Sequence, residues 1–313
     1  MALLAEYALT PDVFDAESYS SGEVGDIHLQ HLKEAILHEA LVRNLRHGRW
    51  LHVFSDNDRA WHQRGRELLR KLVTQNRLNC FQPVLTDEPT TDDGWCSEAI
   101  ASHEVVPLAG VVVTSDPANK FNNVDLVSAI GNLRNANWWR QRSPSVRLSR
   151  NLADYQEHLR LVLRCANSIM FIDPHLDPTQ PRYSHFVNLL LAMEGRSPRP
   201  LIEIHRVCYV GSGPKRQIIP QAELEQWFKQ KLTDPLRDAG LEAHIFVWDD
   251  FHDRYLISNL VGVSIPYGFD TTRQPGSITT WTRLGRADRD DIQREFDPAS
   301  NRHTLRYSFI VPQ

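Results

Sequence analysis

The sequence predicts an α/β fold in which mixed sheets are flanked by helices and are divided between two domains. In the first half, stretches with helical apolar spacing alternate with short apolar runs typical of buried strands. In the second half, the expected order is strand, helix, strand, helix and then three strands, which is typical of a mixed sheet. The length of 313 residues is comfortable for two domains.

The composition is that of a folded protein without a bulk basic surface. Apolar residues make up 41% and charged residues 24% of the chain, which permits a sizeable core and excludes global disorder. Lys and Arg number 35 and Asp and Glu 39, so the net charge is −4. This balance excludes the simplest nucleic-acid-binding class, whose domains are strongly basic, but leaves a local basic groove open.

The sequence points to a cytoplasmic protein with reduced thiols. No apolar run approaches the roughly 20 residues that a membrane span needs. The start, MALLAEYALTPD, has no basic segment and carries Glu6, which argues against a signal peptide. The four cysteines are far apart in the chain and form no CxxC pair, so we expect neither a disulfide framework nor a zinc site. They are Cys80, Cys96, Cys165 and Cys208.

The first half carries the alternating pattern but no recognisable motif. The segment up to Gly25 is expected to be a loop, followed by a helix over residues 27–47 that Gly48 ends. The further expected elements are a strand at 50–54, a helix at 59–74, a loop at 86–98, a strand at 108–113 and a helix at 124–133. We therefore expect residues 1–149 to form an α/β domain of unknown function.

A polar, arginine-rich segment over residues 135–151 is the natural domain boundary. It contains Pro144 and the run Trp138-Trp139-Arg140-Gln141-Arg142. Aromatic rings interleaved with arginines suit base stacking on single strands, and they equally suit packing beside a linker; we favour packing. The boundary is placed between residues 149 and 150.

The secondary-structure pattern of the second half of the sequence is clearer. Helices are expected at 152–166, 183–193 and 220–232, with Gly240 as the alternative end of the last. Strands are expected at 168–173, 201–210, 244–248, 255–258, 261–265 and 304–311.

The most informative segment is His252-Asp253-Arg254, with Asn259 five residues after the arginine and Gly268-Phe269-Asp270 further on. On a strand, residues two apart face the same side, so His252 and Arg254 are expected to project together. An imidazole beside a guanidinium suits a phosphate group, because arginine offers planar, bidentate contacts to anions. Histidine can then act as nucleophile or general acid, and Asn259 can orient a group.

The short pattern H-x-R alone carries little information. It also occurs in this chain at His47, His62 and His158. Only the copy at His252 is followed by Asn or Asp five residues after the arginine. The longer pattern therefore carries the prediction, and a second catalytic histidine would come from a homodimer or from a histidine outside the motif such as His175.

The longer pattern resembles the HxK-x4-D motif of the phospholipase D superfamily. The resemblance implies that His252 attacks a phosphodiester without a metal, that Arg254 binds the phosphate and that a second histidine protonates the leaving group. This chain departs from the family's pattern: arginine replaces lysine, Asn259 replaces aspartate, and PYGFD stands where a GSxxN element is expected. Because Asn lacks charge, it orients a protonated imidazole less strongly than Asp.

The departures match a narrower relative, the C-terminal phospholipase-D-like domain of MIT-domain proteins. The set HDR, Asn259 and GFD resembles that domain, as do the end of the expected strand at Ile172-Asp173-Pro174 and the helix near 224–240. The resemblance covers residues 150–313. In eukaryotic relatives this domain is regarded as a non-catalytic dimer that binds membrane lipid, and related domains occur in prokaryotic conflict systems. Residues 1–149 do not resemble the three-helix MIT domain.

Other candidate site residues follow from position and charge. Asp173 and His175 lie at a strand end, where α/β sheets often place functional groups, although a simple turn there is the alternative. Lys215 and Arg216 follow a glycine pair in a loop that could contact phosphate or be plain surface. Asp270 completes the GFD set as an accessory residue.

We expect no metal and no cofactor. His28, His31 and His38 lie on one expected helix without the HExxH spacing of a zinc site. The leading hypothesis is a phosphodiesterase or nuclease with a phosphohistidine intermediate, acting in prokaryotic antiviral defence on nucleic acid or lipid. The alternative is a non-catalytic scaffold that docks to protein partners, anionic lipid or nucleic acid. A homodimer or a larger complex is expected in either case.

Overall fold

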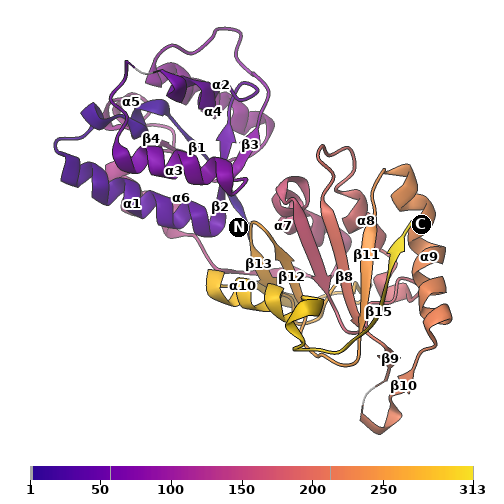
Figure 1. Cartoon of the computed structure of the whole chain (residues 1–313). Helices are drawn as coiled ribbons and strands as arrows, with labels where there is room; N and C mark the ends of the chain where they lie inside the picture. The colour runs from indigo at the N-terminus through magenta and orange to yellow at the C-terminus, as the bar shows by residue number, and fades with distance from the viewer. Residues whose placement is uncertain (1–2, 57, 212, 313) are drawn as a thin grey trace. The chain divides into compact units, whose positions relative to one another are not determined.

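A computed structural model describes residues 3–56, 58–211 and 213–312. The chain forms two compact units, Leu4–Ser143 and Pro144–Gln313, here called the N-terminal and C-terminal units. Each contains a sheet with helices (Figure 1), so the predicted α/β class with helix-flanked sheets is confirmed. The units divide six residues earlier than the expected boundary, because strand β6 (Ser145–Ser149) pairs with β14 (Ile278–Arg283) of the C-terminal unit.

The N-terminal unit has a fully parallel five-stranded sheet of order β3-β2-β1-β4-β5. Its strands are β1 (Ala5–Leu9), β2 (Ala40–Asn44), β3 (Leu78–Cys80), β4 (Gly110–Val113) and β5 (Val127–Ala129). Its helices are α1 (Gly22–Glu39), α2 (Arg49–His52), α3 (Gln63–Thr74), α4 (Asp92–Val105), α5 (Ser115–Lys120) and α6 (Asn137–Arg140). The chain reverses its direction of travel across the sheet between β1 and β4, the switch point at which open α/β sheets commonly bind ligands.

Several expectations for the first half were wrong. The segment expected to be a loop contains the central strand β1, and the expected helix 27–47 stops at Glu39, where β2 begins. Residues 50–54 form α2 and a 3-10 turn, because only Trp50 of this apolar run is buried. The expected loop 86–98 contains the start of α4, whose Thr91 cap accepts a hydrogen bond from the Gly94 amide. The expected helix 124–133 is instead β5 and a 3-10 helix.

A buried ion pair joins the two strands that the sequence did not resolve. Nη2 of Arg43 on β2 lies 2.7 Å from Oε2 of Glu6 on β1, and both side chains are at most 1% exposed. Asn79 on β3 donates a further hydrogen bond to Glu6, and Arg43 also donates to the Ser102 carbonyl on α4. The sheet core is therefore held by a polar network as well as by apolar packing.

The C-terminal unit has a mixed eight-stranded sheet of order β15-β11-β8-β7-β12-β13-β14-β6. Three central strands are parallel, namely β7 (Ser168–Ile172), β8 (Leu201–Val207) and β11 (Ala243–Trp248). The antiparallel neighbours are β12 (Tyr255–Ser258), β13 (Gly262–Ser264) and β15 (Leu305–Val311). A separate hairpin is formed by β9 (Tyr209–Val210) and β10 (Gln217–Ile218). Most predicted strands of this half are confirmed; β6, β14 and the hairpin were missed.

Helices cover both faces of this sheet. They are α7 (Leu152–Cys165), α8 (Phe186–Leu191), α9 (Gln221–Asp238) and α10 (Arg286–Glu295). Phe171 of β7 packs edge-to-face on Phe186 of α8, whereas the neighbouring Met170 lines a cavity with residues of α10. Because successive strand residues face opposite sides, α8 and α10 lie on opposite faces. Within the described ranges, no helix is long and apolar enough to cross a membrane.

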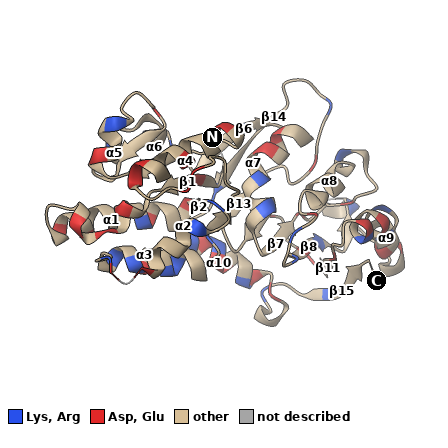
Figure 2. Ribbon diagram, turned by 90° about the horizontal axis from the view of Figure 1, so that it is seen from above, with Lys and Arg blue, Asp and Glu red and all other residues tan. Residues whose placement is uncertain are grey.

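Basic and acidic side chains lie close together on several helices (Figure 2). Figure 2 shows Lys and Arg beside Asp and Glu on α9, for example, where Lys229 pairs with Glu225. All four cysteines are free thiols.

Candidate functional site

The candidate site lies at one edge of the C-terminal sheet. The parallel strands β7, β8 and β11 all end there, and β12 begins there because it runs antiparallel to β7 with Tyr255 opposite Ile172. We call this the C-terminal carboxyl edge. The loops that follow these strands bring together residues that are distant in sequence, which is where α/β sheets concentrate functional groups.

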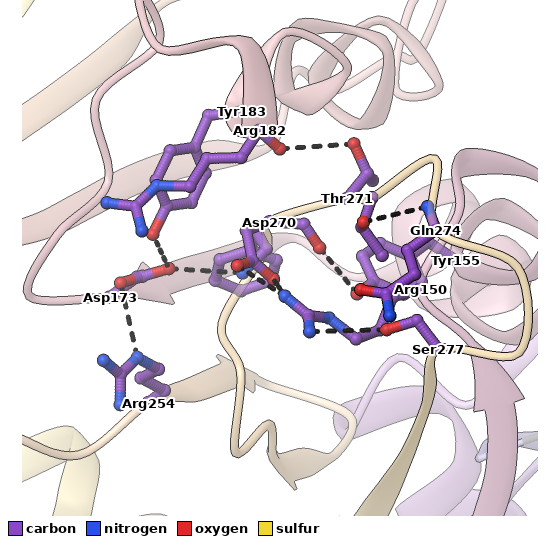
Figure 3. Close-up of polar contacts among 12 residues, drawn as sticks. Arg150, Tyr155, Asp173, Arg182, Tyr183, Arg254, Asp270, Thr271, Gln274 and Ser277 are labelled. Carbon is purple, nitrogen blue, oxygen red and sulfur yellow. Dashed lines mark hydrogen bonds and ion pairs between the residues drawn. The ribbon is translucent and has the colours of Figure 1, made fainter.

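Asp173, directly after β7, is the fixed centre of the edge. Its side chain is fully buried and its Oδ2 accepts hydrogen bonds from the Tyr183 hydroxyl at 3.1 Å and the Phe269 amide at 3.2 Å. Its Oδ1 accepts the amide of His175 at 3.0 Å and faces Nε of Arg254 at 3.6 Å. Figure 3 shows the side chains of Tyr183 and Arg254 pointing toward the Asp173 carboxylate. A buried carboxylate with this many partners holds its neighbours in one arrangement.

Arg254 is the cation that this carboxylate holds. Its side chain is 28% exposed, and Nη1 lies 3.4 Å from the backbone oxygen of His252. Gly268 makes room for the pair: it has a φ of +66°, and a Cβ there would stand 2.0 Å from Oδ2 of Asp173 and 3.1 Å from Cδ of Arg254. The glycine of the GFD set is thus required both by its backbone conformation and by the close approach.

His252 departs from the expected geometry. It lies in the loop before β12 and not on the strand, so the expectation that His252 and Arg254 project together from one strand was wrong. Its side chain is 73% exposed, and its Nε2 lies 3.9 Å from Oδ1 of Asp250. The loop forms because the backbone pairing of β12 begins only with Arg254, whose carbonyl accepts the Ile265 amide.

Asp250 pairs with a second arginine of the edge, Arg216. Its Oδ2 receives Nη1 of Arg216 at 2.9 Å, and its Oδ1 receives the Tyr209 hydroxyl. The Tyr209 hydrogen bond and the Arg216 guanidinium hold the pKa of Asp250 below its ordinary value. Arg216 also stacks 4.3 Å over the Tyr209 ring, while Lys215 beside it is exposed. The hairpin between β9 and β10 therefore brings Arg216 to the edge.

His175 lies at the same edge in a half-buried position. Burial lowers its pKa, and the positive charges of Arg254 and Arg182 lower it further. The imidazole is therefore neutral at neutral pH. A fully buried arginine, Arg206, lies near it and donates to the carbonyls of Val207, Leu176 and Tyr209; burial lowers its pKa to about 10.

Asn259 lies at the opposite edge. Its Oδ1 accepts the amides of Asn167 at 2.8 Å and Ser168 at 3.3 Å, where β7 begins. A strand rises about 3.3 Å per residue, so the five residues that separate it from Arg254 span about 16 Å. The expected role of Asn259 as orienter of the histidine is therefore wrong for this geometry, and the side chain instead fixes the entry to β7.

Asp270 forms an ion pair that borders the edge. Both of its carboxylate oxygens receive Nη2 of Arg150 at 2.6 Å, and its carbonyl accepts the Tyr155 hydroxyl. Arg150 stacks 4.4 Å over the ring of Tyr267, whose residue is 51% exposed. Figure 3 shows this pair beside Asp173 and Arg254. Asp270 thus stabilises the loop that contains Gly268.

The structure brings together Asp173, His175, Arg216, His252 and Arg254, with Asp270 behind them. The sequence missed Tyr183, Asp250 and the buried Arg206. Tyr183 had no signal, because its contact with Asp173 depends on the turn between β7 and α8. Asp250 did have one, since it lies two residues after the predicted strand 244–248, just as Asp173 ends the predicted strand 168–173.

The aromatic-arginine run over residues 138–142 has a structural role. Trp139 is buried, and Arg142 stacks 3.6 Å over its ring and pairs with Glu39 at 2.6 Å, so the aromatic-arginine run is packed as favoured. Among the residues that the structure describes, no group of three or more His, Cys, Asp or Glu could hold a metal ion.

The carboxyl edge of the N-terminal sheet carries the opposite charge at its switch point. A cavity of about 540 Å³ lies there, after β1 and β4, and its lining includes Asp12, Asp92 and Asp116. Asp92 is almost fully buried and accepts hydrogen bonds from the Thr10 hydroxyl at 2.7 Å and the Asp12 amide at 2.9 Å. Burial raises the pKa of Asp92 to about 6.

Comparison with known proteins does not define a family. No protein-family model and no curated protein matches the chain. Among solved structures, the chain is similar to that of TrmBL2, an archaeal chromatin protein described as showing a novel mode of DNA binding. The identity is 12%, the match covers 77% of this chain and 81% of that chain, and the TM-score is 0.30. A likeness at this TM-score carries no argument about fold or function.

Proposed function

We propose that the C-terminal unit recognises phosphodiester groups of nucleic acid, in the manner of a phospholipase-D-like domain that binds its ligand through Arg254. One observation carries the proposal: a fully buried carboxylate, Asp173, holds a partly exposed guanidinium at the carboxyl edge of a mixed α/β sheet. A guanidinium fixed on one side by a carboxylate keeps its other donors in a set orientation for an anion.

The surroundings of Arg254 fit a nucleic-acid backbone. Arg216 and Lys215 from the β9–β10 hairpin and the neutral imidazole of His175 from the loop after β7 add further donors. Tyr267, next to Gly268, is exposed and offers a ring face on which a base can stack. Phosphate contacts with an adjacent aromatic ring are the usual composition of a single-strand binding groove.

Hydrolysis is the extension of this proposal that the resemblance implies. Nε2 of His252 would attack the phosphorus atom, a P–N bond would form as the P–O bond to the leaving group breaks, and water would later cleave the P–N bond. The leaving oxygen needs a proton, and His175, which is neutral at neutral pH, is a poor source of one. We therefore rank recognition above turnover for a single chain; a homodimer would have to supply another acid.

The test is binding and cleavage of a labelled single-stranded oligonucleotide in EDTA. Arg254→Ala should weaken binding about ten- to a hundredfold, since a hydrogen-bonded charge contributes about 1.5–3 kcal/mol. Arg237→Ala is the matched control, because Arg237 is an exposed arginine on α9 that pairs with Asp234. Equal binding by wild type and Arg254→Ala would refute the proposal. Cleavage that His252→Ala abolishes would establish turnover.

Anionic lipid is a second candidate ligand, favoured by the hairpin. Ile218 is 64% and Val210 40% exposed, and they flank the exposed cation Lys215. Apolar and cationic side chains together suit the surface of an anionic membrane. Vesicles of phosphatidylserine provide the test: binding that Ile218→Ser removes and Arg254→Ala leaves intact would favour lipid over nucleic acid.

A further inference from the structure

A second cavity at the N-terminal carboxyl edge is lined mainly by basic side chains. It measures about 470 Å³ and lies where β2 and β3 end. Its lining consists of Arg46, His47, Arg49, His52, Pro83 and Glu88. Four of these six residues carry nitrogen donors and one carries a carboxylate, in contrast to the acidic cavity at the β1/β4 switch point.

The backbone that presents these side chains is strained. Arg46 and His47 have φ values of +55° and +53°, and Gly48 follows at +94°. Left-handed conformations cost non-glycine residues free energy, so two in succession persist only where the surroundings impose them. Here the His47 amide donates to the Phe81 carbonyl at 2.7 Å, and the buried Trp50 anchors the turn from behind.

Arg46 is held in place from the protein side. Its Nη1 donates to Oε2 of Glu98 and to the Leu85 carbonyl, both at 2.9 Å, and its side chain is only 11% exposed. Glu98 is fully buried and also accepts the Val84 amide. A guanidinium fixed by a buried carboxylate is the arrangement that Arg254 shows in the other unit.

Arg49, in contrast, is held by a partner that a ligand can replace. It pairs with Glu88 at 2.6 Å, and the two side chains are 61% and 56% exposed. Exposed ion pairs contribute little to stability, so an anion that enters the cavity can displace the Glu88 carboxylate at small cost. His47 and His52 are exposed beside Arg49 and can donate hydrogen bonds to the same anion.

We propose that this cavity binds a phosphate group, carried by a free nucleotide or by a nucleic-acid chain. Two guanidinium groups and two imidazoles around one space match a tetrahedral anion with several oxygen acceptors. The position also fits, because parallel α/β sheets bind ligands outside the carboxyl ends of their strands. The site shares no residue with the Arg254 site and stands independently of it.

The experiment measures binding of AMP, inorganic phosphate and a short single-stranded oligonucleotide to the full chain by calorimetry. Arg49→Ala combined with His47→Asn should lower the affinity for AMP at least tenfold; asparagine is used because it tolerates the left-handed backbone. Glu88→Gln should raise the affinity, since it removes the competing charge, an effect that a merely structural role would not produce. Thermal unfolding establishes that each variant is folded.

The arms separate the sources of the phosphate and the two sites. The AMP and oligonucleotide arms are run in the Arg254→Ala background, which removes the proposed C-terminal site. There, tighter binding of AMP than of the oligonucleotide identifies a free nucleotide, and the reverse identifies nucleic acid. Because the effect of the Arg49→Ala and His47→Asn changes is measured in the same background, failure of the C-terminal proposal does not affect this one. Absence of binding for all three probes, unchanged affinity in the double variant, or weaker binding in Glu88→Gln would each overturn the proposal.

Discussion

Both units place loops at the carboxyl edge of a sheet, but the switch point of the N-terminal sheet is lined by carboxylates, whereas the C-terminal site presents guanidinium groups. At the switch point of the N-terminal sheet, Asp12, Asp92 and Asp116 line a cavity. At the C-terminal edge, Arg254 and Arg216 emerge from the strand ends. An α/β fold therefore determines where a site lies, whereas the residues that follow each strand determine the charge of the ligand that the site accepts.

The ion pair in the core of the N-terminal sheet also differs from the ion pair at the C-terminal edge in how its cation is held. The N-terminal strands are tied by a pair that is wholly inside the core, Glu6 with Arg43. The C-terminal edge has a buried carboxylate, Asp173, whose cation Arg254 stays partly exposed. A buried cation stabilises the fold, whereas a partly exposed cation remains available to a ligand.

Glu6→Gln should lower the free energy of unfolding of the N-terminal unit by about 3–5 kcal/mol, because it leaves the guanidinium of Arg43 buried without its charge partner. Chemical denaturation followed by hydrogen exchange of each unit measures the loss. Glu88→Gln is the matched control: its pair with Arg49 is exposed, so the same substitution should change stability by at most about 1 kcal/mol. Equal effects of the two variants would contradict the comparison.

Asp92→Asn should stabilise the N-terminal unit at pH 7 by about 1–3 kcal/mol. The pKa of Asp92 is raised to about 6, so the folded state binds more protons than the unfolded state between about pH 4 and 6. The free energy of unfolding of the wild type therefore falls as pH rises through this window, and the variant should lose that slope. A wild-type slope of the opposite sign would refute the account.

Asp173→Asn should lower oligonucleotide affinity about tenfold, because Arg254 loses the charge that orients it. If Asp173 acts through Arg254, the double variant with Arg254→Ala should bind no more weakly than Arg254→Ala alone. Additive losses would show that Asp173 affects binding by another route, such as general unfolding of the edge.

The pH response of the C-terminal edge should have the opposite sign to that of Asp92. The pKa of His175 is lowered by burial, so the unfolded state binds more protons near the ordinary pKa of histidine, about 6.5. The free energy of unfolding of the C-terminal unit should therefore rise as pH increases up to about 6.5. The slope should be smaller than the slope that Asp92 causes in the N-terminal unit, because His175 is only half buried. Hydrogen exchange of the full chain resolves the two units, and His175→Gln should remove the effect.

The sequence predicted strands best where the apolar pattern is complete within the strand itself. Residues 168–172 and 243–248 are apolar runs bounded by polar residues, and they form β7 and β11. The central strand β1 was missed because Glu6 interrupts its apolar pattern. That carboxylate is buried only because Arg43 meets it from 37 positions away, which no local window contains.

The site was predicted in part, for a related reason. The longer pattern, H-x-R followed by Asn five residues later, singled out Arg254, and the strand-end rule singled out Asp173 and His175. The pattern also implied that Asn259 acts beside them, but sequence spacing does not show that β12 runs the full depth of the sheet between Arg254 and Asn259. Tyr183 and Phe269 reach Asp173 only through the folded turn and loop.

The carboxylate of Asp250 has a consequence for the kinetics of ligand encounter. It neutralises Arg216 and lies within 3.9 Å of His252, so an approaching polyanion meets an edge whose cations are already compensated. Long-range attraction, which accelerates the association of strongly charged partners, is then weak, and association should proceed at ordinary diffusional rates. When a polyanion binds, it replaces a carboxylate of the protein as the partner of the arginine. Binding therefore releases fewer counterions than the number of basic side chains would imply.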